Sequence, residues 1–323
     1  MARMKTTKSA LFLTATGTLP VLPAGFIELS EELVVNPTIA TEDIKIINGM
    51  LGANDSIVDT CDNTVTPSIT HRMRTSNIAG LTLETPPAYG TLLKIGGFSE
   101  TITGTGITGV VTYKNTQTPV TGSATMYIDG YKQTATASVA ADLSFDFTVG
   151  KVATITGTLS AFLDNNGVAT AEAAPTITPS VEKFLMVACT DIVTAGGVTL
   201  KAESVKIAMG AEVNKFYGMG LKEFSLDDYK IMVTATFYPD STDYNDAINA
   251  LNAQTVEAID IKLNTTAGGV LVDGKSVQIT AALAKASTFT DSSDKKTLKR
   301  EFTWLLQGNS TGEAITIIHG NHA

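Results

Sequence analysis

The glycine run at residues 104–109 is the stretch whose spacing most resembles a chemical motif. Gly104-Thr-Gly106-Ile-Thr-Gly109 matches the dinucleotide fingerprint, in which a strand precedes the glycines and a following helix receives the pyrophosphate. The residues that follow, Val110 to Tyr113, are β-branched or aromatic and predict a strand instead. We therefore interpret the run as a flexible turn and predict no bound cofactor.

The densest basic spot in the chain is His71-Arg72-Met73-Arg74. A functional interpretation makes it an anion site, and the alternative is a solvated strand or an interface. In an acidic chain, two arginines are better explained by pairing with carboxylates on a neighbour, because the guanidinium fork matches a carboxylate.

Two further groups could hold a metal or supply acid–base catalysis. His319 and His322 lie in the tail HGNHA, where a frayed terminus is the commoner explanation than a metal site. Asp227-Asp228 has no histidine or nucleophile nearby in the sequence, which is more typical of a solvated turn. The sequence contains no nucleophile elbow, Cys–His pair or phosphate loop. We predict no catalytic, cofactor-binding or metal residues, and a protein that is not an enzyme.

The elements that carry these residues are mostly strands. Thr, Ala, Val and Gly are abundant and only 17% of residues are charged, a composition that suits many strands and turns. The net charge of −9 argues against a protein that grips DNA or an anionic membrane, but it fits a surface that nucleic acid slides past. No stretch approaches the roughly 20 apolar residues of a membrane span.

The amino terminus, MARMKTTKSALFLTATG, imitates a signal peptide, but threonines interrupt its apolar run. We interpret it as a mature terminus that forms a strand. Cys61 and Cys189 have no second Cys or His at metal spacing. A reduced pair is favoured, since two cysteines in a chain of this size do not make a disulfide scaffold, although a single bridge stays open.

The clearest local pattern is a series of four predicted strands over residues 122–163. The first ends at Asp129-Gly130, a dipeptide that favours a two-residue type I′ hairpin, and the second returns through Tyr131–Val139. The third alternates large apolar with smaller or polar residues, so one face carries Leu143, Phe145, Phe147 and Val149. A turn at Gly150-Lys151 leads into the fourth. The series is a half-buried antiparallel meander.

Two short amphipathic helices accompany the strands. The first is predicted at Pro86–Ile95, with Thr85 as N-cap, Gly96-Gly97 as its stop and an apolar stripe of Tyr89, Leu92 and Leu93. The second is predicted at Tyr244–Leu251, with Ser241 or Thr242 as its cap.

The same order of parts occurs twice: strands, a capped helix, an Asp-Gly turn (Asp129-Gly130, then Asp273-Gly274) and a closing apolar strand. We predict a mainly β fold of antiparallel β-sandwich or barrel modules, each flanked by a short α-helix and duplicated within the chain. The modules are residues 1–170 and 171–323, joined by a polar linker within Asp164–Ser180. The alternative is that any all-β chain offers such turns and helices by chance.

Four segments follow one another along the first half of the chain: PAYGTLLKIGGF (87–98), VTY (111–113), SATMYIDG (123–130) and LSFDFTVGK (143–151). This succession resembles the tail tube, or major tail, proteins of long-tailed bacteriophages. The resemblance covers about residues 80–165, and the second half fits it in layout more than in letters.

The resemblance implies a virion protein, made in the bacterial host cytoplasm, that forms rings stacked into a hollow tail tube. Inner strands of neighbouring copies would join around a channel that holds the tape-measure protein and later passes DNA without specific binding. A duplicated chain would form trimeric rings, and a single module hexameric ones. Further implied partners are tail-terminator and baseplate or distal tail proteins, and a sheath protein only in a contractile tail.

If this family applies, the helices at Pro86–Ile95 and Tyr244–Leu251 would lie on the tube wall. The extended segments Thr64–Gly80 and Thr199–Lys215 would contact other copies within or between rings. Two other classes stay open: a surface adhesin or pilus-like β protein, and a capsid decoration protein that never forms a tube.

Replacing Phe145 or Phe147 by Asp is expected to abolish folding, because either change would bury an unpaired charge. Circular dichroism and solubility of the purified variants would test this expectation. A soluble variant that still forms rings would contradict it.

Overall fold

The structure is a computed structural model of the chain, and it describes residues 9–45, 54–75, 82–116, 118–177, 182–239, 249, 251–294 and 297–322. In the first half the strands are β1 (Ser9–Thr14), β2 (Phe26–Ile27), β3 (Thr38–Lys45), β4 (Asn54–Val65), β5 (Ser68–Arg72), β6 (Phe98–Thr103), β7 (Val110–Asn115), β8 (Gly122–Ile128), β9 (Tyr131–Thr148), β10 (Thr154–Phe162) and β11 (Thr170–Ala171). The helical elements are α1 (Gly90–Ile95) and the 3₁₀ turns η2 (Gly106–Thr108) and η3 (Asn165–Gly167).

In the second half, every element whose bounds are described is a strand. They are β12 (Ile192–Ala195), β13 (Val198–Leu200), β14 (Ala202–Ala208), β15 (Ala211–Gly218), β16 (Leu221–Tyr229), β17 (Met232–Phe237), β18 (Val256–Leu263), β19 (Val277–Asp294), β20 (Thr297–Leu306) and β21 (Thr316–Gly320). The fold is mainly β, antiparallel and sandwich-like, which confirms the predicted class. Among the described residues, no helix is long and apolar enough to cross a membrane.

The predicted four-strand meander consists of three strands. Asp129 and Gly130 both have positive φ angles, so the tight β8–β9 hairpin forms as expected. The predicted second and third strands are wrong as separate elements, because the chain runs through them as the single 18-residue strand β9. An irregularity near Ala137 (φ 50°) interrupts the ladder with β8 and lets the chain continue without a turn.

The first predicted helix is shorter than its sequence pattern. Helix α1 begins at Gly90 with Tyr89 as its N-cap, so the expected start at Pro86 and the cap at Thr85 are wrong. Its apolar stripe is correct, since Tyr89, Leu92 and Leu93 are all fully buried. Of the second predicted helix, only Asn249 and Leu251 are described; both are helical, as are Asn252 and Ala253, and residues 244–248 and 250 lie outside the described part.

Of the other local predictions, some are confirmed and some are wrong. The amino-terminal apolar run is the strand β1, as predicted. Asp273-Gly274 is not a tight hairpin, because it lies inside the longer connection between β18 and β19. The predicted linker is partly built into the fold, since Thr170 and Ala171 pair with Lys132 and Tyr131 of β9.

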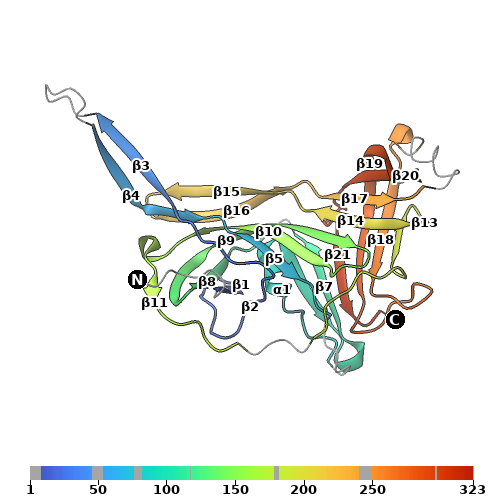
Figure 1. Cartoon of the computed structure of the whole chain (residues 1–323), viewed down its shortest axis with the longest axis horizontal. Helices are drawn as coiled ribbons and strands as arrows, with labels where there is room; N and C mark the ends of the chain where they lie inside the picture. The colour runs from blue at the N-terminus through green and yellow to red at the C-terminus, as the bar shows by residue number, and fades with distance from the viewer. Residues whose placement is uncertain are drawn as a thin grey trace.

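One continuous hydrophobic core runs from Leu11 to Ile317 and includes residues of both halves. The boundary predicted at residue 170 therefore stays a prediction, because packing does not separate two cores there. Two long hairpins lie outside this core (Figure 1): β3–β4 projects outward, and β15–β16 lies along β9 and β10, where Phe224 and Leu226 pack against Ala140 and Phe162. Lys215 Nζ on β15 donates to Asp62 Oδ2 on β4 at 2.7 Å, which ties one hairpin to the other.

A buried ion pair holds the last hairpin together. Arg300 is fully buried on β20, and its Nε and Nη2 donate to Asp291 Oδ1 at 2.7 Å and Oδ2 at 2.9 Å. The guanidinium also lies 4.8 Å from the ring centre of Phe289. Removing the carboxylate would leave a buried cation without its bidentate partner, which is far more costly than losing an exposed pair.

We expect Asp291→Ala to lower the free energy of unfolding by about 3 kcal/mol in urea denaturation. The matched control is Glu203→Gln, which breaks an ion pair between Lys299 and a half-exposed Glu203 and is expected to cost less than about 1 kcal/mol. Equal losses for the two variants would contradict this assignment.

Candidate functional site

The most extended feature that could support a function is a continuous antiparallel sheet that crosses both halves of the chain. Seven strands lie in the order β5–β10–β9–β14–β17–β20–β19, each hydrogen-bonded to the next. The halves meet where Phe145 and Phe147 of β9 pair with Ile207 and Val205 of β14. This pairing makes one sheet from what the sequence presents as two modules.

Strand β9 can join the halves because it is long enough to use both of its edges. Over Ser144–Asp146 it pairs with β10 on one edge and β14 on the other. At Val139 it pairs with β10 and β8. The strands β8 and β14 therefore follow one another along the same edge of β9.

The pairing pattern of the first half recurs in the second. In the first half β1 pairs with β2 and β8, β9 pairs with β8 and β10, and β10 pairs with β5. In the second half β12 pairs with β13 and β18, β19 pairs with β18 and β20, and β20 pairs with β17. The projecting hairpins β3–β4 and β15–β16 also hold the same place in the two series.

One face of the seven-stranded sheet is covered by hydroxyl groups. A single row of directly paired residues crosses all seven strands in the order Arg72, Thr154, Asp146, Lys206, Thr234, Thr303 and Thr288. The neighbouring row includes Thr148, Ser204, Thr236, Glu301 and Thr290. All of these side chains are at least partly exposed, whereas the alternate residues Phe145, Ile207, Val233 and Phe302 are buried in the core.

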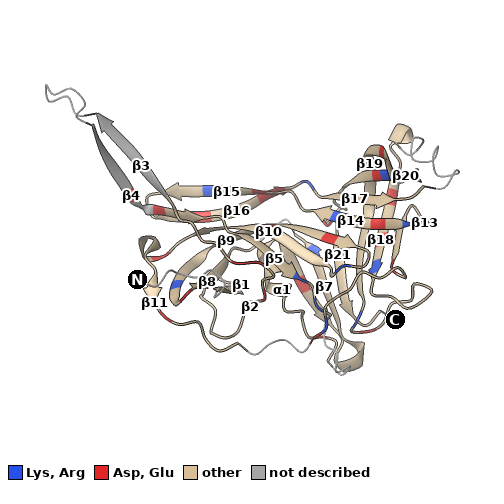
Figure 2. Cartoon of the chain, in the orientation of Figure 1, with Lys and Arg blue, Asp and Glu red and all other residues tan. Residues whose placement is uncertain are grey.

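The charges on this face are of both signs. Lys206 lies directly opposite Asp146, and Glu301 lies opposite Thr236 and Thr290. Figure 2 shows acidic and basic residues interspersed along the strands of both halves in the described part. The two positive and two negative residues in these rows cancel, so the net charge of −9 does not come from them, and the other residues of the two rows carry hydroxyl groups.

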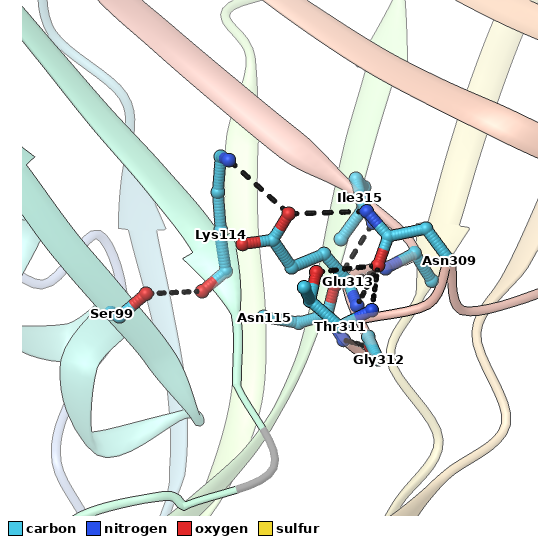
Figure 3. A network of polar contacts seen from close by, with 9 residues as sticks. Ser99, Lys114, Asn115, Asn309, Thr311, Gly312, Glu313 and Ile315 are labelled. Atoms are coloured by element: carbon cyan, nitrogen blue, oxygen red, sulfur yellow. Dashed lines mark hydrogen bonds and ion pairs between the residues drawn. The ribbon is translucent and has the colours of Figure 1, made fainter.

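The carboxyl-terminal segment joins the second half to the first. Strand β21 lies between β7 and β19 and pairs with both. Just before it, Asn115 Oδ1 accepts the backbone N–H groups of Ala314 at 2.7 Å and Ile315 at 2.9 Å (Figure 3). Lys114 Nζ lies 3.2 Å from Glu313 Oε2, beside the same contacts. The expected frayed terminus is thus wrong, because β21 is an inner strand.

The histidines take part in a buried polar and aromatic cluster. His319 Nε2 lies 3.1 Å from the Tyr89 hydroxyl, and the rings of Tyr113 and Tyr89 pack against it. The His71 ring also packs against Tyr89, and its Nδ1 lies 2.6 Å from the Glu28 carbonyl oxygen. His322 makes a separate contact, with Nε2 3.1 Å from the Ser276 carbonyl oxygen, and its charge also lowers the pKa of His319. Within the described residues, no three His, Cys, Asp or Glu side chains are grouped to hold a metal ion.

The remaining motifs of the sequence also have structural partners. Arg74 donates to both carboxylate oxygens of Glu28, at 2.8 and 2.9 Å, so its partner is a carboxylate of its own chain. Arg72 is exposed on the sheet face. Asp227-Asp228 lies on the strand β16, so the expected turn is wrong; Asp227 accepts from Asn214 Nδ2 at 2.7 Å.

The last two features named in the sequence analysis are the glycine run and the two cysteines. Residues 104–109 form the turn between β6 and β7 through η2, and a strand follows, as predicted. The Cys189 thiol is exposed and free, and the backbone of Cys61 lies in β4. None of these placements brings two chemically reactive groups together among the described residues.

Sequence reasoning missed the sheet that joins the halves. The signal available was the alternation of Val205 with Ile207 and of Phe145 with Phe147, which marks two half-buried strands but not their pairing. No protein-family model matches the chain, and a search of curated proteins finds no match either. The functional argument therefore depends on the geometry of the sheet.

The buried histidines predict a loss of stability in acid. Burial lowers the pKa of His319 to about 3 and also lowers the pKa of His71, although the Glu28 carbonyl opposes the second shift. The unfolded chain binds protons on both imidazoles near pH 6.5, whereas the folded chain binds them only at lower pH, so their contribution to stability is complete above pH 6.5 and falls below it. For His319 the loss continues down to about pH 3.

We expect the free energy of unfolding to fall between pH 6.5 and 5, by up to about 1.4 kcal/mol per pH unit for each buried histidine. The window lies above the range in which most carboxylates titrate. Urea denaturation of wild type and His319→Gln would test the assignment, since the variant should show a shallower slope. An equally steep slope in the variant would show that other groups cause it.

Proposed function

We propose that this chain is a structural protein that self-assembles into rings, and that the stacked rings form the tail tube of a long-tailed bacteriophage. The observation that carries the proposal is the seven-stranded sheet, in which two corresponding sets of strands lie side by side. A sheet built by repetition can be extended by further copies of the same unit, and closure of such a series removes exposed edges.

The internal repetition supports a trimeric ring. If each half of the chain contributes one equivalent unit, three copies supply six units around an axis. The contact between β9 and β14 would then stand in for a contact between separate subunits. A protein that assembles in this way uses one head-to-tail interface repeatedly, and such interfaces give rings when the rotation closes.

The hydroxyl-rich face supports a channel that DNA crosses without being held. Threonine and serine hydroxyls interact with phosphate weakly, and the scattered Lys206 and Arg72 are accompanied by Asp146 and Glu301. Strong nonspecific DNA binding needs clustered Lys and Arg to neutralise several phosphates. If this face lines the lumen, the genome would slide past it.

The geometry suggests a ring, and the sequence resemblance over about residues 80–165 is what suggests that the ring belongs to a phage tail tube. Under the proposal the chain resides in the virion tail after assembly in the bacterial cytoplasm. Its partners would be itself, the tape-measure protein, the tail terminator and the baseplate or distal tail proteins. A sheath protein joins them only if the tail is contractile, and the proposal assigns the chain no catalytic role.

The projecting hairpins provide surfaces for contacts beyond one ring. The tip of β15–β16 exposes Phe216, Tyr217, Met219 and Leu221, and Met219 is fully solvent-exposed. Exposed apolar side chains at the end of an arm are typical of a contact site. We assign this arm to contacts between stacked rings.

Negative-stain electron microscopy of the purified protein tests the function. We expect rings with a central hole that stack into tubes, and three-fold symmetry in class averages if the halves are equivalent units. A six-fold ring would contradict the interpretation that each half of the chain is one equivalent unit, but it would still support a tube. A compact particle without a hole would overturn the tube and favour a decoration protein or an adhesin.

A further inference from the structure

The outer edge of β19 is the place where the seven-stranded sheet ends. Ala284 and Lys285 pair with β18 on one edge and β20 on the other, but beyond Lys285 the pairing with β18 stops. From Ala286 to Asp294, β20 continues along one edge, and no described residue pairs with the opposite edge. Ser287, Thr288, Thr290, Ser292 and Ser293 are exposed there.

Apart from a β-bulge at Ala286–Thr288, this edge lacks the features that usually prevent pairing with another chain. The segment Ala286–Ser293 contains no Lys, Arg, Pro or Gly, and it includes the strand-favouring residues Thr288, Phe289 and Thr290. The only charged residue in it, Asp291, has its carboxylate bound to the buried Arg300. The edge is therefore suited to accept an added strand.

The corresponding edge in the first half is occupied, and its occupant belongs to the second half. On β9, strand β8 is followed along the same edge by β14, which pairs with Ser144–Thr148. On β19, strand β18 holds the place of β8, and the place of β14 has no described strand. The edge of β9 beyond β8 is therefore paired with β14, whereas the corresponding edge of β19 beyond β18 is paired with no described strand.

The residues that correspond to β14 lie at the other end of the sheet. Strand β14 follows β13 and leads into the β15–β16 hairpin, and in the first half residues 28–37 follow β2 and lead into β3–β4. Leu29 bridges to His71 of β5, and Ser30 N–H donates to the Thr70 carbonyl at 2.8 Å, as β14 pairs with β17. Beyond Ser30 the chain forms no strand until Thr38, and Glu31, Val34 and Asn36 are exposed.

We propose that residues 30–37 of a second copy of this chain add as an antiparallel strand to the β19 edge at Ala286–Asp294. The pairing repeats between copies what β14 and β9 do within one chain. It deepens the proposed function, on which it rests, by naming the two edges that join neighbouring copies. Because the edges lie at opposite ends of the sheet, each copy offers one and accepts one, as a head-to-tail series requires.

The side chains of the added segment fit the pattern of β14. In Glu31-Glu-Leu33-Val-Val35, Leu33 and Val35 take the places of Val205 and Ile207 on β14, and the exposed Val34 takes the place of Lys206. Leu33 is already fully buried in the isolated copy, and Val205 and Ile207 are buried where β14 pairs with β9. Pairing would let the segment extend as a strand while its apolar side chains stay on the core side.

Cysteine cross-linking between two singly substituted proteins tests the pairing. In a background with Cys61→Ser and Cys189→Ser, Val34→Cys is mixed with Thr288→Cys, Thr290→Cys or Ser292→Cys and oxidised. Adjacent strands bring Cα atoms within disulfide range, so at least one mixture should give a disulfide-linked heterodimer, several-fold above the control. The matched control is Thr101→Cys, on the outer edge of β6 and also exposed.

The outcomes separate this inference from the proposed function. Rings in the microscope without a cross-link in any of the three mixtures would overturn the strand pairing and leave the tube intact. A cross-link in a protein that never forms rings would support the pairing and overturn the tube. If the protein neither assembles nor cross-links, both fail.

A non-covalent test uses charge at the edge. The double variant Thr288→Lys/Thr290→Lys should lower assembly in sedimentation velocity while the melting temperature of the monomer stays the same, because lysines block edge pairing. Thr101→Lys on β6 should assemble as the wild type does. Wild-type assembly of the double variant would contradict the proposed edge.

Discussion

The backbone ladder between β9 and β14 is the interaction on which the rest of the structure depends. Five residues of β9, Ser144–Thr148, pair with Ser204–Ala208 and turn two sets of strands into one sheet. Backbone N–H and C=O groups that leave water must find partners, so a strand edge buried between the halves needs this ladder. The side chains at the joint are large and apolar, so the ladder and the core reinforce each other.

The other contacts between the halves depend on that joint. With β9 and β14 paired, β21 can enter between β7 and β19 and bring His319 under Tyr89. Asn115 then satisfies two backbone N–H groups that precede β21. These are polar contacts in a buried place, where an unpaired group costs about 1–3 kcal/mol, so they favour one arrangement of the halves over others.

The residues that look chemical in the sequence have structural partners in the fold. Arg74 and Arg300 form bidentate pairs with Glu28 and Asp291, and the rings of His71 and His319 both pack against Tyr89. What the described surface offers instead is a large hydroxyl-bearing sheet with ends that can be continued. A function in assembly follows from such a surface more directly than a function in catalysis does.

The sequence alone determined the class of the fold and several of its strands. Strict alternation on the third meander strand, the Asp129-Gly130 turn and the apolar stripe of Tyr89, Leu92 and Leu93 are local effects of side-chain period and backbone preference. They were correct because nothing distant competes with them. The repeated order of parts was also visible, since it depends only on sequence succession.

Only the tertiary structure decided which strands meet. Alternation shows that Phe145 and Ile207 each belong to a half-buried strand, but it carries no information on their pairing across sixty residues of chain. The separate strands expected at Tyr131–Val139 and Leu143–Val149 merged because one ladder continues through Ala137, and the carboxyl terminus became an inner strand because two edges were free to receive it. Strand pairing is a long-range choice made by shared burial, and local patterns do not contain it.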